Sequence, residues 1–170
     1  MVYSDNHMTN IVYTDSQISE FLSEEKVVLN PKAKWKEQRK SQRKNYNLVS
    51  ADGNRKYTLF IRQNIILPDN FSCGLIIEIP GNESITLVRY NGCDHPHINI
   101  LEDEDVSYRF HIHKATEKYM SVGRKAEHYA EVTERYNCWE GALHCLVNDC
   151  NVVGLKLPDI DMTRDMFYDD

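Results

Sequence analysis

The chain has 170 residues, of which 41% are hydrophobic and 27% charged, and its formal net charge is -6. These proportions are typical of one folded domain with its own core and exclude a largely disordered chain. No run approaches the ~20 consecutive apolar residues of a membrane span, and the chain does not start like a signal peptide. We therefore expect a cytoplasmic domain with no membrane contact.

The N-terminal third of the sequence predicts a short helix followed by a hairpin. Thr14-Asp15-Ser16 supplies capping residues ahead of apolar positions 18, 21 and 22, which have helical spacing. Asn30-Pro31 prevents this helix from continuing, because proline disfavours helix at the residue before it. A turn at 51–54 precedes aromatic and β-branched residues at 56–62, which is the pattern of a hairpin. We expect residues 1–13 to form a mobile acidic arm.

The middle of the sequence predicts a β meander. Residues 71–79 place five apolar side chains on one face, and a turn at 80–82 leads to the next strand at 84–90. Such short turns join antiparallel neighbours. We expect a further strand at 108–113, followed by polar, helix-compatible sequence at 115–130.

The C-terminal part predicts an amphipathic helix. Asn137 and Glu140 have the spacing of a capping box, and the apolar residues from Trp139 to Cys150 share one helical face. Residues 158–170 are a second acidic arm. The expected fold is a single α+β domain, 1–170. It has an antiparallel meander of four to five strands, a C-terminal amphipathic helix on one face and a short N-terminal helix.

The cysteine and glycine patterns argue against several kinds of functional site. The five cysteines are an odd number without a C-x-x-C pair, which argues against disulfides and against a thiolate zinc site. We expect reduced thiols, with Cys138 and Cys145 as packing residues. The glycines are dispersed, so no glycine-rich phosphate loop is predicted and no cofactor is expected.

Charge is distributed unevenly along the chain. Residues 1–25 have a net charge of -5, residues 26–62 have +9 and residues 63–170 have -10. The basic stretch can attract the phosphates of RNA, or it can be a solvated face that pairs with the protein's own acidic ends. Its candidate RNA-binding residues are Lys34, Lys36, Arg39, Lys40, Arg43 and Lys44.

Four of the seven histidines fall within nineteen residues as two H-x-H pairs. If residues 111–113 form a strand, its period of two points both rings to the same face. The candidate catalytic residues are His95, His97, His111, His113 and Arg89. The polar neighbours that could orient them or bind substrate are Asn91, Asn99, Arg109 and Lys114.

Three interpretations of these histidines compete. The imidazoles, with Asp94, could hold a metal ion, although acidic ligands are sparse. Alternatively, one imidazole acts as base and another as acid in metal-free cleavage of RNA, with a nearby cation on the developing charge. The third is a hydrogen-bonded loop packed on the sheet without turnover. We assign no metal ligand at this stage and expect substoichiometric zinc.

Several motifs resemble a family of uncharacterised bacterial and phage proteins. They are RYNG at 89–92, HPHIN at 95–99, HIHKATEKY at 111–119 and EGAL at 140–143, within a match that spans roughly 55–150. Their order is also similar to that in the TumE-like toxins of toxin-antitoxin modules. The resemblance implies that Arg89, Asn91 and the four histidines are site residues. The loop 100–107 departs from this expectation, because it is acidic.

Two functional hypotheses follow. The leading one is a small toxin-like protein that acts on or binds RNA and has an antitoxin as a possible partner. The alternative is a non-enzymatic inhibitor, an anti-defence protein of phage or mobile-element origin, whose acidic surface binds a basic host protein. The first places the sensitive residues among the histidines and bases, and the second among the surface acids. Whether the protein is an enzyme, and its oligomeric state, stay open.

Overall fold

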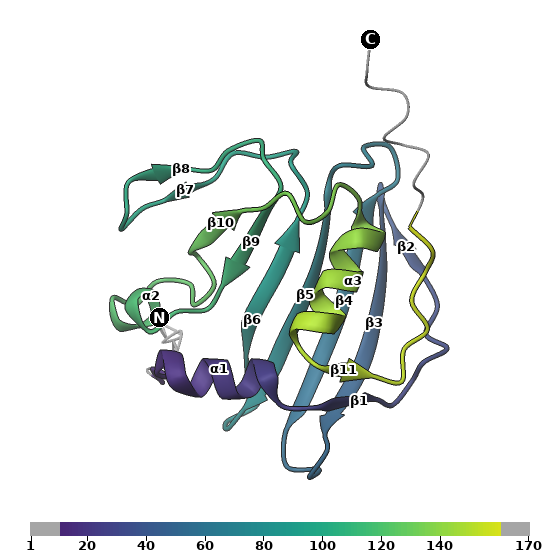
Figure 1. Ribbon diagram of the computed structural model, residues 1–170, viewed down its shortest axis with the longest axis horizontal. Helices are drawn as coiled ribbons and strands as arrows, with labels where there is room; N and C mark the ends of the chain where they lie inside the picture. The colour runs from purple at the N-terminus through teal and green to yellow at the C-terminus, as the bar shows by residue number, and fades with distance from the viewer. Residues whose placement is uncertain (1–10, 161–170) are drawn as a thin grey trace, which may run out of the picture.

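The computed structural model describes residues 11–160, which form an α+β fold (Figure 1). The helices are α1 (Asp15–Ser23), α2 (Glu117–Ser121) and α3 (Trp139–Asp149). The four long strands are β3 (Ser41–Ser50), β4 (Lys56–Asn64), β5 (Phe71–Ile79) and β6 (Glu83–Asn91). The short strands are β1 (Lys26–Val28), β2 (Lys36–Gln38), β7 (Ile98–Asn99), β8 (Glu104–Asp105), β9 (His111–Lys114), β10 (Ala130–Val132) and β11 (Val152–Val153).

One large sheet organises the described residues. Its strands lie in the order β10-β9-β6-β5-β4-β3-β1-β11, and β2 pairs with β3. The predicted meander is confirmed, because β3, β4, β5 and β6 are consecutive antiparallel neighbours. The nine-stranded sheet is nevertheless larger than the four to five strands expected. It gains β1, β2, β10 and β11, which are too short to leave a periodic pattern in the sequence.

The two longer helices cover one face of the sheet, and the hydrophobic core lies beneath them (Figure 1). Cys73 of β5 contacts the backbone of Trp139 in α3, and Tyr57 of β4 donates a hydrogen bond to the carbonyl of Phe21 in α1. These contacts fix which side of each strand faces the helices. Buried core residues on these strands are Leu59, Ile61, Leu75, Ile77, Val88, Tyr90 and Ile112.

The ends of the helices match the sequence prediction only in part. Thr14 caps α1, and its hydroxyl oxygen and the side chain of Gln17 form a capping box. For α3 the predicted cap at Asn137 is wrong. Cys138 is still extended, with φ -149° and ψ 165°, so it occupies the cap position itself. Glu140 is therefore one residue too early in the helix to complete the predicted box.

Two other expectations are corrected near the second H-x-H pair. The strand expected at 108–113 begins only at His111, because Tyr108 adopts a left-handed backbone with φ 55°. Of the helix-compatible stretch 115–130, only α2 is helical, and Gly123 with φ 72° turns the chain soon after it. The expected arms extend into residues 1–10 and 161–170, which lie outside the described residues. No helix within 11–160 is long and apolar enough to cross a membrane.

Candidate functional site

The candidate site lies on the face of the sheet opposite α1 and α3, which we call the open face. Paired residues of neighbouring strands point to the same side, so the strand register assembles two transverse rows of side chains. The first row runs Lys36, Arg43, Arg62, Ser72, Asn91, His111. The second, next to it, runs Asn45, Phe60, Gly74, Arg89, His113.

This register places the candidate catalytic residues of β6 and β9 together. Asn91 is paired with His111, and Arg89 with His113, so all four side chains lie on the open face. Gly74 leaves room beside them: a Cβ there would be 2.4 Å from the ring of Phe60. Arg43 stacks on the same ring, 5.2 Å from its centroid. The open face therefore joins basic residues of β3 and β4 to the histidines of β9.

The loop that follows β6 folds its two histidines back over this end of the open face. The ring of His95 lies 4.9 Å from that of His111, and the ring of His97 lies 4.6 Å from that of His113. Gly92 lets the chain pass close to Asp69 at the start of this loop, because a Cβ at this position would collide with the backbone carbonyl of Asp69. The four predicted histidines are thus one spatial group, which we call the histidine cluster.

The hydrogen bonds of the strand pair determine its tautomers. Nδ1 of His111 lies 2.7 Å from the carbonyl oxygen of Arg109, and Nδ1 of His113 lies 2.9 Å from that of Glu127. A carbonyl oxygen can only accept, so each Nδ1 carries a proton and donates it. In a neutral imidazole the remaining nitrogen, Nε2, is then a bare lone pair. These two Nε2 atoms lie only 3.2 Å apart.

Burial keeps both rings neutral. His111 is fully buried and His113 is 2% exposed. Burial lowers the pKa of His111 to about 4 and that of His113 to about 2, and the neighbouring positive charge of Arg89 acts in the same direction on both. Burial also lowers the pKa values of His95 and His97. Neither strand histidine is thus an imidazolium at neutral pH, and the two Nε2 atoms face each other as acceptors without a proton between them.

His97 and His128 are anchored differently. Asn99 is fully buried, and its amide exchanges two hydrogen bonds of 2.8 Å with the backbone of Ala130 in β10. Because the backbone N–H of Ala130 identifies Oδ1 of Asn99 as an acceptor, Nε2 of His97, 3.2 Å away, donates to it. Nε2 of His128 bonds the carbonyl of Ile98. Asn99 thus pins the loop on the sheet, a structural role beside the binding role predicted for it.

Two polar atoms next to the strand histidines have no partner. Among the described residues, buried side-chain atoms without a hydrogen bond are Nε of Arg89, Oδ1 of Asn91 and Oε2 of Glu83. The first two belong to residues paired with His113 and His111. Nδ2 of Asn91 is 3.3 Å from Nε2 of His95. An unpaired buried polar atom costs about 1–3 kcal/mol, and two beside one cluster point to a site built for a ligand.

The remaining predicted residues divide between the site and its surroundings. Lys114 is engaged in an ion pair with Glu131, 3.0 Å away. Arg109 is exposed and contributes its carbonyl to His111. Sequence reasoning missed Glu127, which is 4% exposed and orients His113 through its backbone carbonyl. A backbone contact leaves no residue-type pattern, so no sequence signal could have identified it.

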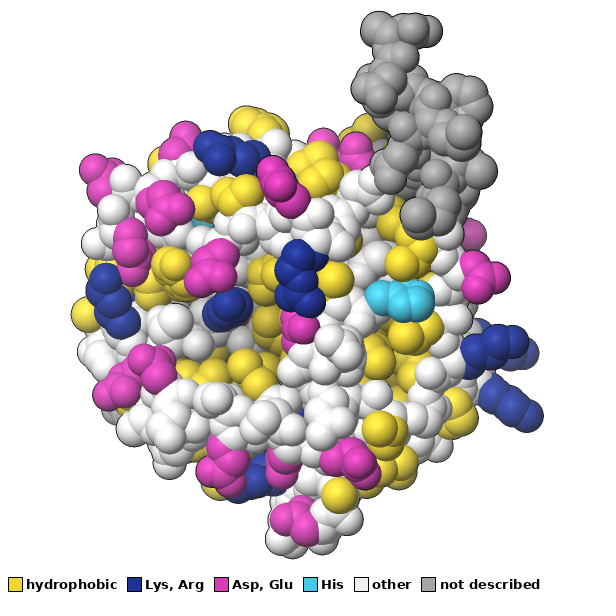
Figure 2. Space-filling model, in the orientation of Figure 1, with side chains coloured by type: hydrophobic (Ala, Val, Ile, Leu, Met, Phe, Trp, Pro, Cys, Tyr) yellow, Lys and Arg dark blue, Asp and Glu magenta, His cyan; other side chains and the backbone are white. Residues whose placement is uncertain are grey.

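The basic stretch 26–62 is split between the two faces. Lys36, Arg43 and Arg62 belong to the open face, whereas Lys44 points to the helix side and lies 4.6 Å from the centroid of the Trp35 ring. Lys34 is exposed ahead of β2. On the helix side, acidic and basic side chains are interspersed, and histidine is visible as a small patch among hydrophobic side chains (Figure 2).

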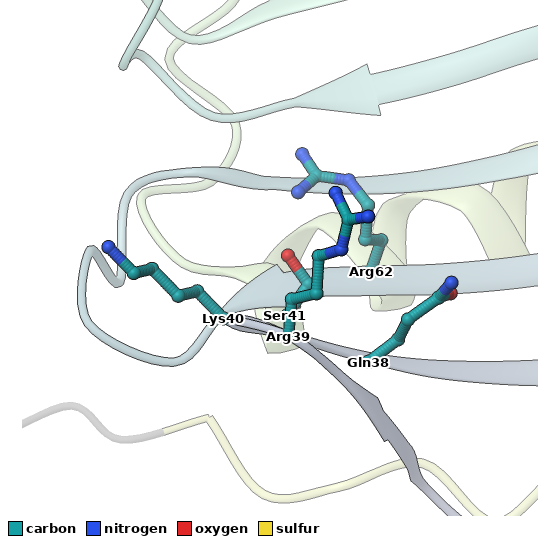
Figure 3. Close-up of a pocket in the computed structure, with 5 residues that line it drawn as sticks. All are labelled: Gln38, Arg39, Lys40, Ser41 and Arg62. Carbon is teal, nitrogen blue, oxygen red and sulfur yellow. The ribbon is translucent and has the colours of Figure 1, made fainter.

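A cationic pocket of about 510 Å³ lies at the turn between β2 and β3. Gln38, Arg39, Lys40, Ser41 and Arg62 line it. Figure 3 shows that Arg39 and Arg62 extend in the same direction while Lys40 points away from them. Burial, together with the charges of Arg89 and Arg43, lowers the pKa of Arg62. The pocket thus continues the positive charge of the open face.

The cysteines offer no competing reactive centre. Cys73, Cys93, Cys145 and Cys150 are free thiols, and burial raises the pKa of Cys150 to about 12 and that of Cys73 above its ordinary value. Their thiols stay protonated at neutral pH and are poor nucleophiles.

No family model matches the chain, and no curated protein or solved structure matches it either. The function has to be argued from the open face and the histidine cluster.

Proposed function

We propose that the protein binds single-stranded RNA along the open face and acts on one of its phosphodiesters at the histidine cluster. The proposal rests on the transverse row of side chains that leads from Arg43 through Arg62 to His111. It crosses four strand spacings, about 19 Å at ~4.8 Å each. Phosphates of an extended strand laid along this row would meet the cations first. At its end they would meet the partly exposed His95 and His97, which lie over the buried His111 and His113.

The charge balance of the open face supports an anionic ligand. In the described part of the chain, neither Arg43 nor Arg62 nor Arg89 takes part in an ion pair. Burial lowers the pKa of Arg62, and the positive charges of Arg89 and Arg43 lower it further. Arginines that form no ion pair on one face are an electrostatic site for phosphates, and the net negative charge of the whole chain does not remove this local field.

An exposed aromatic side chain beside the cluster favours a single strand over a duplex. Tyr108 is 67% exposed, and its backbone N–H donates to the carbonyl of His95. Its φ of 55° is uncommon for a bulky residue, and its backbone bond to His95 keeps it beside the histidine loop. Unstacked bases pack on such rings, which contributes about 1–3 kcal/mol per base. This function agrees with the resemblance to TumE-like toxins.

The binding proposal can be tested with fluorescence anisotropy on a labelled single-stranded RNA. We expect Arg43→Gln and Arg62→Gln each to weaken binding about 5-fold at low salt and to reduce the salt slope by about one. Lys44→Gln is the matched control, because it removes one charge from the neighbouring position on the helix side. It should change the affinity less than about 2-fold.

Two outcomes would overturn the RNA proposal. One is no binding at low salt, and the other is an equal loss in Arg43→Gln and Lys44→Gln, which would mean that the open face is not the interface. Cleavage of the RNA is followed separately on gels. In the anisotropy measurement, Tyr108→Ala should weaken RNA binding about 10-fold through lost stacking. If the surface acids matter and the arginines do not, the inhibitor hypothesis takes precedence.

A further inference from the structure

We propose that His95, His111 and His113 form a binding site for a divalent transition-metal ion of the zinc class. Ligand nitrogen atoms of these three residues all lie within 4.8 Å of one another. His111 and His113 come from the rigid strand β9, and His95 comes from the loop that covers it. The inference concerns the same cluster as the proposed function, but it does not depend on RNA.

The distance between the two strand histidines fits a shared ion. Zinc binds imidazole nitrogen at about 2.0–2.1 Å, so two ligands of a tetrahedral zinc lie about 3.3 Å apart. The Nε2 atoms of His111 and His113 are 3.2 Å apart. Without a cation between them, two lone pairs face each other inside the protein. A metal ion converts this repulsion into two bonds.

The Nδ1 hydrogen bonds of both strand histidines have the form that is usual in metal sites. A metal-bound histidine usually donates its other ring N–H to a carbonyl or a carboxylate, which fixes the tautomer and the ring orientation. Here the carbonyl of Arg109 accepts from Nδ1 of His111, and the carbonyl of Glu127 accepts from Nδ1 of His113. Neutral imidazoles are also the protonation state that binds a metal. The backbone has thus prepared both strand histidines to bind through Nε2.

The ligand count leaves a position open. His97 donates its Nε2 proton to Asn99, so this nitrogen is not available as a ligand. Three protein ligands with an open fourth position are the arrangement of catalytic rather than structural zinc. The neighbouring charged groups are Arg89 and the buried carboxylate of Glu127, which interacts with Arg89. An ion next to Arg89 makes the centre strongly positive, so its open position suits an anionic oxygen such as that of a phosphate.

The metal itself is the probe for this site. Protein without an affinity tag is titrated with Zn²⁺ against a chromogenic chelator, and Co²⁺ is used to record the visible absorption of a four-coordinate site. We expect one ion per chain. His113→Gln and His95→Ala should each weaken zinc binding more than about 100-fold, because loss of a ligand exceeds the 10–100-fold effect of an outer-shell change.

Controls separate the site from general histidine affinity and from folding. His144→Gln changes a histidine of α3 that bonds the carbonyl of Pro158, and it should bind zinc like the unchanged protein. His95 is a partly exposed loop residue, so His95→Ala keeps the test valid even if His113→Gln fails to fold. Less than about 0.2 zinc per chain, or full binding by His95→Ala and His113→Gln, overturns the proposal. RNA binding measured with chelator present tests the arginines separately.

Discussion

Lys26 and the strand histidines are buried polar groups of the same sheet, but their hydrogen bonds are satisfied in opposite ways. The ammonium of Lys26 is fully buried and donates to three carbonyl oxygens, those of Leu22, Glu24 and Cys150, at 2.7–3.0 Å. Each of its three protons has an acceptor. His111 and His113 instead turn two lone pairs toward each other, with unpaired atoms of Arg89 and Asn91 alongside.

The partners of Lys26 explain why its burial is tolerated. Its three acceptors lie at the C-terminal ends of α1 and α3, where the helix dipole and the free carbonyls favour a cation. The ring of Tyr57 adds a cation-π contact at 4.9 Å. Burial lowers the pKa of Lys26 to about 8, so the ammonium still predominates at neutral pH. A complete polar network of this kind joins two helices to the sheet, whereas an incomplete one is a place for a ligand.

The largest expected effect comes from breaking the complete network. Lys26→Met keeps the length of the side chain but leaves three buried carbonyls without a donor, so we expect a loss of about 3–5 kcal/mol in the free energy of unfolding. Urea denaturation followed by circular dichroism measures it. Lys56→Met, at an exposed position of β4, is the control and should stay within about 0.5 kcal/mol. A loss below about 1 kcal/mol for Lys26→Met would contradict this account of the network.

A second, intermediate effect concerns acid stability of the metal-free protein. The folded-state pKa values of His111 and His113 lie below the ordinary 6.5, so the unfolded chain binds more protons between pH 6.5 and about 4. Stability is therefore complete above pH 6.5 and is lost as the pH falls. With up to ~1.4 kcal/mol per pH unit for each ring, the two rings together should cost about 3 kcal/mol between pH 6.5 and 5.

The variants for this measurement compare the two buried strand histidines with His144 of α3. Unfolding is followed in chelator at several pH values. The double variant His111→Gln/His113→Gln should show a much shallower slope, with the remainder due to His95 and His97, whose pKa values are also lowered. His144→Gln should keep the full slope. If the double variant keeps it too, burial of the strand histidines is not the cause of the acid sensitivity.

Much of the site could be predicted from local patterns. The period of two in a strand places His111 and His113 on one face, and turn residues predict the meander that carries β6 next to β5. The two H-x-H motifs were recognisable as one candidate group. These predictions succeed because they depend on residues close together in the sequence.

The rest of the site depends on contacts that no local pattern encodes. Arg62 reaches the histidines through the register of three strand pairs, and a slip by one residue would turn it to the other face. The basic stretch looks uniform in sequence, yet its neighbours Arg43 and Lys44 lie on opposite faces. The tautomer of His113 is set by the backbone of Glu127, fourteen residues away. The tautomer of a histidine that is set by a distant backbone carbonyl can be assigned only from the three-dimensional structure.

The smallest expected effect on stability comes from replacing a cation by methionine in the incomplete network, which consists of Arg89, Asn91 and the strand histidines. Arg89→Met removes a guanidinium whose buried Nε has no partner and whose pKa burial lowers. The gain from removing an unpaired donor offsets the lost attraction to Glu127, so the free energy of unfolding should stay within about 1 kcal/mol or rise. RNA affinity should nevertheless fall about 5-fold, because one phosphate-binding charge is lost. Denaturation and anisotropy on Arg89→Met and Lys26→Met measure both properties side by side. Equal destabilisation by the two substitutions would mean that Arg89 is as well satisfied as Lys26, and the distinction between a structural and a ligand-binding network would fail.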